Sequence, residues 1–341
     1  MRYCVWNNKG GVGKTFLTYC LAVEYAIKHP DRAVAVIDMC PQANISEMLL
    51  GGNGPGEANL TKFYESKRTI ACYIMDRQRG GWANKIGNEI NYFAQVQKFN
   101  PNLPNNLYLL PGDFDLDGCA EVIDYVSRSP TLRNAWTLSR TFLRDIIPLF
   151  EQQHKKNTAV FIDTNPSFAN YTQAGIVAAD RLIVPCTADY ASIRGICNIF
   201  YRIFGINEVN GRAVYHDDME TFYSRSHIAG INLPKIHTFI LNKSRSHDRR
   251  ASAAYTAHVD EITKIISSLV KSHKDQFSQS RNKRIFNIKD GNTLSTVLNY
   301  NGLAPSQLQH RRYTVYDGET QVNDTQIVAF QKDVAALVKT L

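Results

Sequence analysis

Short apolar runs alternate along the chain with stretches in which apolar side chains recur at helical spacing. Nearly continuous apolar runs are typical of parallel strands that are buried on both faces. Their alternation with helices predicts an α/β fold, a doubly wound and mostly parallel β-sheet flanked by helices. The predicted strands are residues 3–6, 33–38, 107–110, 159–163, 178–185, 235–242 and 284–288.

The helical spacing predicts helices at residues 15–29, 131–154, 251–270 and 292–300, and a further helix that begins at Asp189. Four glycines and a proline at 51–60 predict a flexible loop. We expect one domain over residues 1–341, with insertions near 61–106 and 207–233. The last helix, 324–341, is apolar on one face, which favours docking on the core over a membrane-targeting role.

The stretch 3–15, YCVWNNKGGVGKT, joins the first predicted strand to the first helix. It fits the phosphate-loop pattern G-x-x-x-x-G-K-[ST] with Asn8 at the first glycine position. The glycines let backbone N–H groups close around phosphate oxygens, and the helix N-terminus adds partial positive charge. Lys14 is then expected to reach the β- and γ-phosphates, and the Thr15 hydroxyl to bind Mg²⁺.

Lys9 gives this loop the form KGGVGKT, which resembles the deviant phosphate loop of the ParA/MinD family of ATPases. The segments DMCPQAN at 38–44 and DTNPS at 163–167 are similar to that family's D-x-D-P-Q-x-N and D-T-P-P-S motifs. The resemblance is strongest to ParA-type DNA-partition ATPases. It implies an ATP-dependent homodimer in which Lys9 reaches the nucleotide of the partner subunit.

The resemblance also implies the site residues. Catalytic roles fall to Lys9, Lys14 and Asp38, and Mg²⁺ is held by Thr15, Asp38 and, through water, Asp163. Asn242, at the end of the sixth predicted strand, is expected to contact adenine, although a plain turn residue fits it nearly as well. The expected ATP-binding residues are Lys9, Gly10, Gly11, Val12, Gly13, Lys14, Thr15, Phe16 and Asn242.

Two positions in the segments 38–44 and 163–167 depart from the family pattern, and one of them is Asn165, which replaces the first proline of D-T-P-P-S. Cys40 stands where the family has the aspartate that orients the attacking water. A neutral thiol is a poor activator of water, so we expect ATP binding with slow hydrolysis, unless another group orients the water. A regulatory protein that holds ATP and barely hydrolyses it is therefore an alternative.

The chain carries a net charge of +8 and has a pI near 9.0, which favours a polyanionic partner. Between Lys264 and Lys289 there are seven Lys or Arg against one acidic residue, Asp275, and the pairs Arg249-Arg250 and Arg311-Arg312 flank them. Nonspecific DNA binding needs only such cations on one face, while a merely solvated face is the ordinary alternative. The basic residues in the run are Lys264, Lys271, Lys274, Arg281, Lys283, Arg284 and Lys289.

The seven cysteines form no C-x-x-C pair and lie mostly in apolar runs, which indicates a reducing cytosol. We therefore expect a cytoplasmic protein. The resemblance to ParA-type ATPases further implies association with the nucleoid and a ParB-like activator as a possible partner, and membrane binding is not expected. A membrane-cycling factor like MinD and a metabolic ligase of the same fold class are the remaining alternatives. Asp113, Asp115 and Asp117 are expected to be solvated turn and cap residues, since the rest of a calcium loop is missing.

Overall fold

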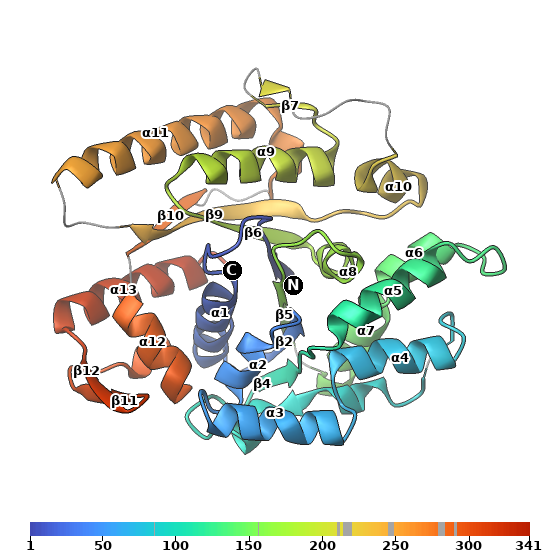
Figure 1. The fold of residues 1–341 in the computed structure, drawn as a ribbon, viewed down its shortest axis with the longest axis horizontal. Coiled ribbons are helices and arrows are strands. Elements are labelled where there is room, and N and C mark those ends of the chain that lie inside the picture. The colour runs from blue at the N-terminus through green and yellow to red at the C-terminus, as the bar shows by residue number, and fades with distance from the viewer. Residues whose placement is uncertain are drawn as a thin grey trace.

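The computed structural model describes residues 1–84, 86–155, 157–209, 212–213, 220–244, 249–278, 284–289 and 292–341. Its centre is an eight-stranded sheet in the order β10-β9-β6-β1-β5-β2-β4-β3 (Figure 1). Neighbouring strands are parallel except for β3, which runs antiparallel to β4 at one edge. The predicted doubly wound, mostly parallel sheet is confirmed. The strands are β1 Arg2–Val5, β2 Ala33–Met39, β3 Ala94–Gln95, β4 Leu107–Leu110, β5 Thr158–Thr164, β6 Arg181–Cys186, β9 Lys235–Ser244 and β10 Ile285–Lys289.

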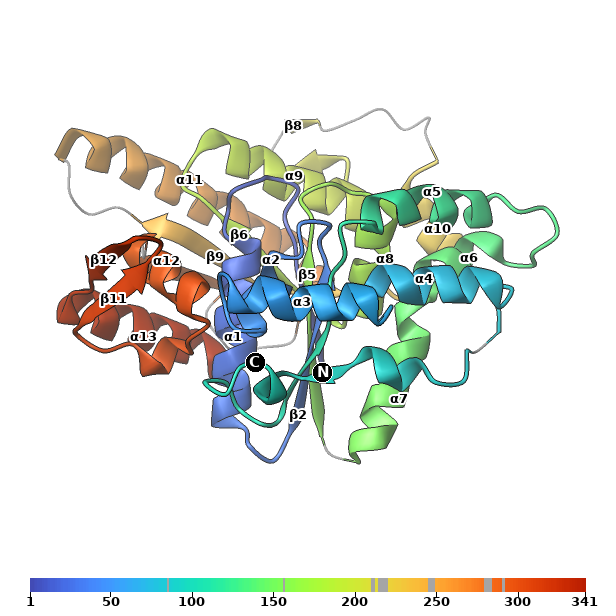
Figure 2. The same ribbon diagram turned by 60° about the horizontal axis from the view of Figure 1, so that its bottom comes forward.

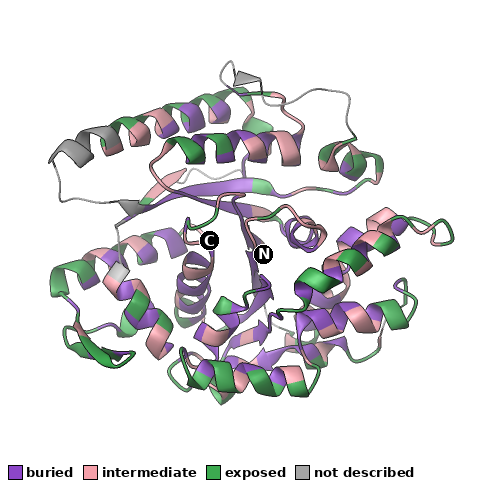
Figure 3. Ribbon diagram, viewed as in Figure 1, coloured by how far each residue is buried: buried purple, intermediate pink, exposed green. Residues whose placement is uncertain are grey.

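Helices cover both faces of the sheet, and each face has its own apolar core (Figures 1 and 3). All seven residues of β2 are buried, which explains why that strand is apolar without alternation. One face carries α1 Lys14–Lys28, α2 Asn44–Leu49, α3 Pro55–Glu65, α12 Asn292–Asn301 and α13 Asp324–Val338. The other carries α4 Ile70–Arg79, α5 Leu116–Ser127, α7 Leu143–His154, α8 Asn170–Ala178, α9 Tyr190–Phe204 and α11 Arg249–Ser272.

The C-terminal helix α13 docks on the core, as its pattern predicted. Its apolar face, which includes Phe330 and Val334, is buried beside α1 and β10. The Phe330 ring stacks on the Phe16 ring of α1, with 5.9 Å between the ring centroids. The chain end is fixed as well, since the Tyr3 hydroxyl donates a hydrogen bond of 2.5 Å to the carbonyl oxygen of Leu341.

The prediction of a flexible loop at 51–60 is wrong for its second half, where α3 begins at Pro55 (Figure 2). Proline suits the first turn of a helix, because the N–H group it lacks would have no helical partner there. The glycines serve close packing instead. A Cβ on Gly56 would lie 2.1 Å from the carbonyl oxygen of Glu47, so only glycine lets α3 approach α2 this closely.

The helix predicted at 131–154 is divided into α6, Ala135–Thr141, and α7, with the buried Phe142 at the junction. The segment 61–106 contains the end of α3, the helix α4 and the edge strand β3. Asp113 and Asp115 lie in the turn before α5, where the Asp113 carboxylate accepts a hydrogen bond of 2.9 Å from the Asp115 N–H. Both are turn residues as predicted, but Asp113 is buried, so the prediction of a solvated side chain is wrong there, and Asp117 lies in the first turn of α5.

Two features of the second half were not predicted from the sequence. The segment 207–233 contains a small antiparallel pair and a helix, although residues 210–211 and 214–219 lie outside the described part of the chain. A hairpin also separates α12 from α13, next to the chain's carboxyl-terminal helix (Figure 1). These elements are β7 Glu208–Val209, β8 Arg212–Ala213, α10 Phe222–Ile228, β11 Arg312–Val315 and β12 Gly318–Gln321.

All seven cysteines are free thiols, and six of them are buried, as their apolar surroundings in the sequence suggested. Within the described residues, no helix combines the length and the apolar character that a membrane span needs.

Candidate functional site

The loop between β1 and α1 folds into an anion-binding shape. Gly11 and Gly13 have φ values of 71° and 85°, in the left-handed region that favours glycine. A Cβ on Gly13 would lie 2.1 Å from the amide nitrogen of Asn242, so this position also requires glycine for space. Helix α1 begins at Lys14 with neither a side-chain cap nor an acidic residue in its first turn. Its first N–H groups and its positive dipole end are therefore available to an anion.

Asn7 shapes this loop, and sequence reasoning missed it. It is fully buried, and its amide nitrogen donates a hydrogen bond of 2.7 Å to the carbonyl oxygen of Pro185 at the end of β6. Its amide oxygen accepts the N–H of Lys9 at 3.0 Å. A Cβ on Gly195 of α9 would lie 2.8 Å from that oxygen. Asn7 thus ties the start of the loop to β6, and the only sequence signal was a polar residue directly after a buried strand.

Asp38 and Asp163 end the neighbouring strands β2 and β5 in register with each other, and both are fully buried. The Thr15 hydroxyl donates a hydrogen bond of 2.8 Å to Asp163, and the Thr18 hydroxyl donates one of 3.1 Å to its other oxygen. Burial raises the pKa of both carboxyl groups, and for Asp38 the nearby charge of Asp163 raises it further. Two adjacent buried carboxylates with a hydroxyl are the oxygen ligands that Mg²⁺ prefers, so this group fits that ion.

The Lys14 side chain lies beneath the loop, where its ammonium group donates a hydrogen bond of 3.0 Å to the carbonyl oxygen of Lys9. Burial lowers the pKa of Lys14 to about 8, although Asp163 partly opposes that shift. A bound phosphate would favour the charged form, because it would supply the negative charge that the buried ammonium group lacks.

Asp38 is held by groups that follow it in the chain. Its carboxylate accepts the Cys40 N–H at 3.0 Å and the Ser46 hydroxyl at 2.7 Å. Ser46 therefore links α2 directly to the predicted magnesium site, a role that the sequence alone did not reveal. Cys40 lines the adjoining cleft, and burial raises the pKa of its thiol to about 12. The thiol is consequently neutral near pH 7 and cannot act as a base.

Lys9 bonds to its own chain, at the start of α9. Its ammonium group donates a hydrogen bond of 2.6 Å to the Thr187 hydroxyl and forms an ion pair with Asp189. Asp189 also caps α9, because its carboxylate accepts the Ser192 N–H at 2.9 Å. Partial burial alone would raise the pKa of Asp189, but the hydrogen bonds from Lys9, Thr187 and Ser192 hold it below its ordinary value. Contact between Lys9 and a partner subunit stays a prediction.

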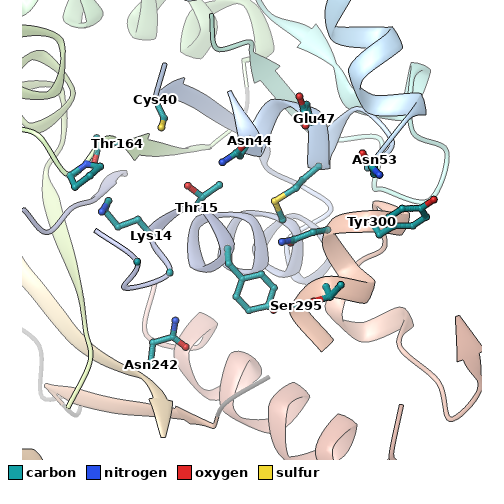
Figure 4. A pocket seen from close by; sticks show the side chains of 18 of the residues that line it. Lys14, Thr15, Cys40, Asn44, Glu47, Asn53, Thr164, Asn242, Ser295 and Tyr300 are labelled. Atoms are coloured by element: carbon teal, nitrogen blue, oxygen red, sulfur yellow. The ribbon is translucent and has the colours of Figure 1, made fainter. Parts of the chain in front are cut away.

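A cleft with a volume of about 640 Å³ opens beside the loop (Figure 4). Gly11, Gly13, Lys14, Thr15 and Phe16 line one end of it. The far end is lined by residues that the sequence did not single out, contributed by α2, by Gly52 and Asn53, by α12 and by Tyr316 in the turn of the β11–β12 hairpin. The volume is within the range of sites that enclose one small-molecule ligand.

Asn242 also lines this cleft, but it mainly supports the loop. Its amide nitrogen donates a hydrogen bond of 3.1 Å to the carbonyl oxygen of Val12. Figure 4 shows Asn242 and Tyr300 at opposite ends of the cleft. The predicted contact between Asn242 and adenine stays a prediction.

The family of the chain follows from comparison with known proteins. A family model described as an AAA domain, AAA_31, matches residues 2–214. The chain belongs to this AAA domain family. The matched span contains the loop at 7–15, Asp38, Asp163 and the Asp189 cap. It therefore covers nearly all of the phosphate-binding half of the site.

Among curated proteins, the chromosome partitioning protein ParA of Myxococcus xanthus is 26% identical over 203 residues, which are 59% of this chain and 56% of that protein. A ParA family protein of Mycoplasma genitalium is 23% identical over 204 residues, 60% of this chain and 65% of that one. The matched part thus spans between about half and two thirds of these relatives. The resemblance to ParA-type partition ATPases is confirmed.

Two solved structures share the fold. The ATP complex of a McdA variant from Cyanothece has a TM-score of 0.57 and 17% identity, covering 98% of this chain and 95% of that one. A plasmid partition protein of Borrelia burgdorferi B31 bound to AMPPNP has a TM-score of 0.52 and 16% identity, covering 100% and 99%. The likeness therefore extends over the whole sheet and both helical layers.

The predicted basic surface is only partly reproduced among the described residues. Lys264, Lys271 and Lys274 are exposed on α11 and just after it. Arg284 instead bonds inward, to the carbonyl oxygen of Ser278 at 2.6 Å. The pair Arg311-Arg312 lies at the β11–β12 hairpin, away from α11 (Figure 1). Arg281 and Lys283 lie outside the described residues.

Proposed function

We propose that this protein is a partition-type ATPase that binds ATP with Mg²⁺ at the β1–α1 loop. The observation that carries the proposal is the meeting of Lys14, Thr15 and two in-register buried carboxylates at the carboxyl ends of β1, β2 and β5. In open α/β sheets this edge is where ligands bind. Lys14, whose pKa is lowered by burial, lies next to the backbone N–H groups of the loop, and together they suit a triphosphate. The two carboxylates suit the metal ion that accompanies it.

Each residue of the loop has a separate task in this proposal. The N–H groups of residues 10–16 hold the phosphate oxygens, and Lys14 neutralises charge on the β- and γ-phosphates. Mg²⁺, when bound, offsets the negative charge that develops on the phosphates during transfer. Asp38 and Asp163 keep the metal side of the site anionic, and Ser46 fixes the orientation of Asp38.

Slow hydrolysis follows from Cys40. The neutral thiol lines the cleft where a carboxylate would orient the attacking water, and it supplies no proton acceptor. The same observation favours a second candidate function, a regulatory protein that holds ATP and releases it largely unhydrolysed. The two candidates differ in whether a partner, such as a ParB-like activator, restores turnover.

Dimerisation requires Lys9 to leave Asp189. In the present arrangement the Lys9 ammonium group is bonded at the start of α9, and its side chain is one-quarter exposed. A γ-phosphate offered by a second protomer presents more negative charge than one carboxylate. ATP bound between two protomers would thus draw Lys9 across the interface, and the dimer would present two sets of α11 cations to DNA phosphates.

The test measures oligomeric state and DNA binding together. With ATP, we expect a dimer in sedimentation and DNA binding that weakens as salt rises; with ADP or no nucleotide, we expect a monomer with weaker DNA binding. Lys9→Ala should bind ATP yet remain monomeric. A wild-type protein that stays monomeric with saturating ATP would contradict the dimer mechanism, and salt-independent DNA binding would contradict the phosphate contacts. In cells, this activity would be expected on the nucleoid in the cytoplasm.

A further inference from the structure

Several of the polar side chains that line the end of the cleft away from the loop have no hydrogen-bond or ion-pair partner among the described residues. Within the described part of the chain, Asn44, Glu47, Asn53 and Asn299 form neither a side-chain hydrogen bond nor an ion pair. The Tyr300 hydroxyl is likewise without a hydrogen bond. We name this end the outer chamber, and it consists of Asn44, Glu47, Asn53, Asn299, Tyr300 and Tyr316.

The wall of the outer chamber is built with close backbone contacts. The Asn53 N–H donates a hydrogen bond of 3.0 Å to the carbonyl oxygen of Tyr300, which joins the α2–α3 loop to the end of α12. A Cβ on Gly52 would lie 2.3 Å from that same oxygen, so glycine is required there. The Tyr316 ring packs edge-on against the Tyr300 ring, with 5.3 Å between the centroids. The chamber is therefore a fixed corner of the fold, lined by side chains that are left unbonded.

The chemistry of the chamber differs from that of the loop. Among the described residues that line the cleft, Lys14 is the only basic one. The chamber offers amides, one carboxylate and two aromatic rings, which suit a flat, neutral ligand that carries N–H or O–H donors. Because loop and chamber form one continuous cleft, a ligand held at the loop by its phosphates would extend into the chamber with its uncharged half.

We propose that the outer chamber binds the nucleoside half of ATP, and that Glu47 is the specificity-determining acceptor for one of its donors. This inference rests on the proposed ATP function and identifies what selects the nucleotide. The donor is either the exocyclic amine of adenine or a ribose hydroxyl, since both are N–H or O–H groups that a carboxylate accepts.

The position of Glu47 links this recognition to the metal site. Glu47 follows Ser46, whose hydroxyl donates to Asp38. A nucleoside bound to Glu47 therefore holds the same turn of α2 that orients the Asp38 carboxylate. Triphosphate alone would occupy the loop without making this contact.

The experiment measures dissociation constants by calorimetry with Mg²⁺ for ATP, inosine triphosphate, 2′-deoxy-ATP and inorganic triphosphate. We expect wild-type protein to bind ATP about tenfold tighter than at least one of the two analogues, because a hydrogen bond to a charged group is lost. Glu47→Ala should lose that preference and bind inorganic triphosphate as tightly as wild type. The matched control is Glu65→Ala, which removes an exposed carboxylate at the end of α3 that lies outside the cleft lining and should keep the preference.

A second variant addresses the aromatic wall. Tyr316 has a φ of 52°, so Tyr316→Gly removes the ring at a position that glycine adopts without strain. It should fold normally and bind ATP several-fold more weakly, with inorganic triphosphate unaffected. The inference is overturned if wild type binds all three nucleotides equally, or if Glu47→Ala keeps the full preference for ATP. If neither ATP nor inorganic triphosphate binds wild type, the proposed function itself fails.

Discussion

The two ends of the cleft differ in how far their side chains are buried and in whether those side chains are bonded to the protein. At the loop, Lys14, Asp38 and Asp163 are buried and bonded to protein groups before any ligand arrives. In the outer chamber, Glu47 and Asn53 are partly or fully exposed and their side chains are unbonded. The side chains at the loop end are therefore already held in place for a charged ligand. The side chains of the outer chamber are exposed to solvent and would gain a bonding partner only when a ligand binds.

Because of this difference, substitutions at the two ends should affect ligand binding and protein stability differently. Substitutions at the loop end change buried charges, so they alter the free energy of unfolding as well as ATP affinity. Substitutions in the outer chamber are expected to alter selectivity with little effect on folding, because surface side chains without partners contribute little to stability. The following predictions test the loop end, from the largest expected effect to the smallest.

Lys14→Ala should have the largest effect. Removing a buried cation that pairs with phosphate is expected to weaken ATP binding roughly a hundredfold or more. The ligand-free protein should not lose stability, because burial already disfavours the charged form of Lys14. Calorimetry and thermal unfolding would measure both quantities, with Lys28→Ala at the other end of α1 as control. Wild-type ATP affinity in Lys14→Ala would refute the assignment.

Cys40→Asp should raise the rate of ATP hydrolysis by about a hundredfold, because it supplies a proton acceptor beside the cleft. It also places a third carboxylate near Asp38 and Asp163, so the metal-free protein should become less stable. Single-turnover kinetics would measure the rate. The control is Cys40→Asn, because asparagine has nearly the shape of aspartate but carries no charge. An unchanged rate in Cys40→Asp would show that another group orients the water.

Asp163→Asn should stabilise the metal-free protein by on the order of 1 kcal/mol at pH 7, because it removes one of two repelling buried charges. In wild type the folded pKa of the pair is raised, so the folded state holds more protons than the unfolded state above about pH 4. Stability without metal therefore falls as pH rises from about 4 through neutrality. Denaturant unfolding at several pH values should show a shallower fall in the variant.

The same Asp163→Asn variant should gain less stability from ATP with Mg²⁺ than wild type does, since a metal-facing carboxylate is lost. The amide oxygen can still accept the Thr15 hydroxyl. The Thr18 hydroxyl loses its acceptor on the other side of the group but can still donate to the carbonyl oxygen of Lys14. Equal thermal stabilisation by ATP and Mg²⁺ in both proteins would argue against a metal site here.

Asp189→Asn should have the smallest effect. Asparagine still caps α9, but the ion pair that holds Lys9 is gone. Because this pair is partly exposed, its loss is worth at most about 1 kcal/mol, or roughly fivefold. ATP-dependent dimerisation should therefore begin at a several-fold lower protein concentration in sedimentation. Weaker dimerisation in this variant would mean that Asp189 assists Lys9 instead of retaining it.

The sequence was informative wherever the chemistry is local. Glycines, a lysine and a threonine must be contiguous to make a phosphate loop, so residues 7–15 could be recognised directly. Asp38 and Asp163 were found because each directly ends an apolar strand, and parallel strands end at one edge. The wrong prediction at 51–60 also came from reading the local sequence alone. Glycines at 51–60 suggested flexibility, although Gly52 and Gly56 are there for close contact with elements that the sequence cannot place.

What the sequence determined by itself is the order of the seven parallel strands, the phosphate loop and the two carboxylates at the ends of β2 and β5, because each depends on neighbouring residues or on strand ends. Tertiary structure decided the rest. It joined Lys9 to Asp189, Ser46 to Asp38 and Asn242 to Val12, and it brought Glu47 and Tyr300 to one cleft across more than two hundred residues of chain. Those pairings come from the packing of whole helices against the sheet, which no local pattern records.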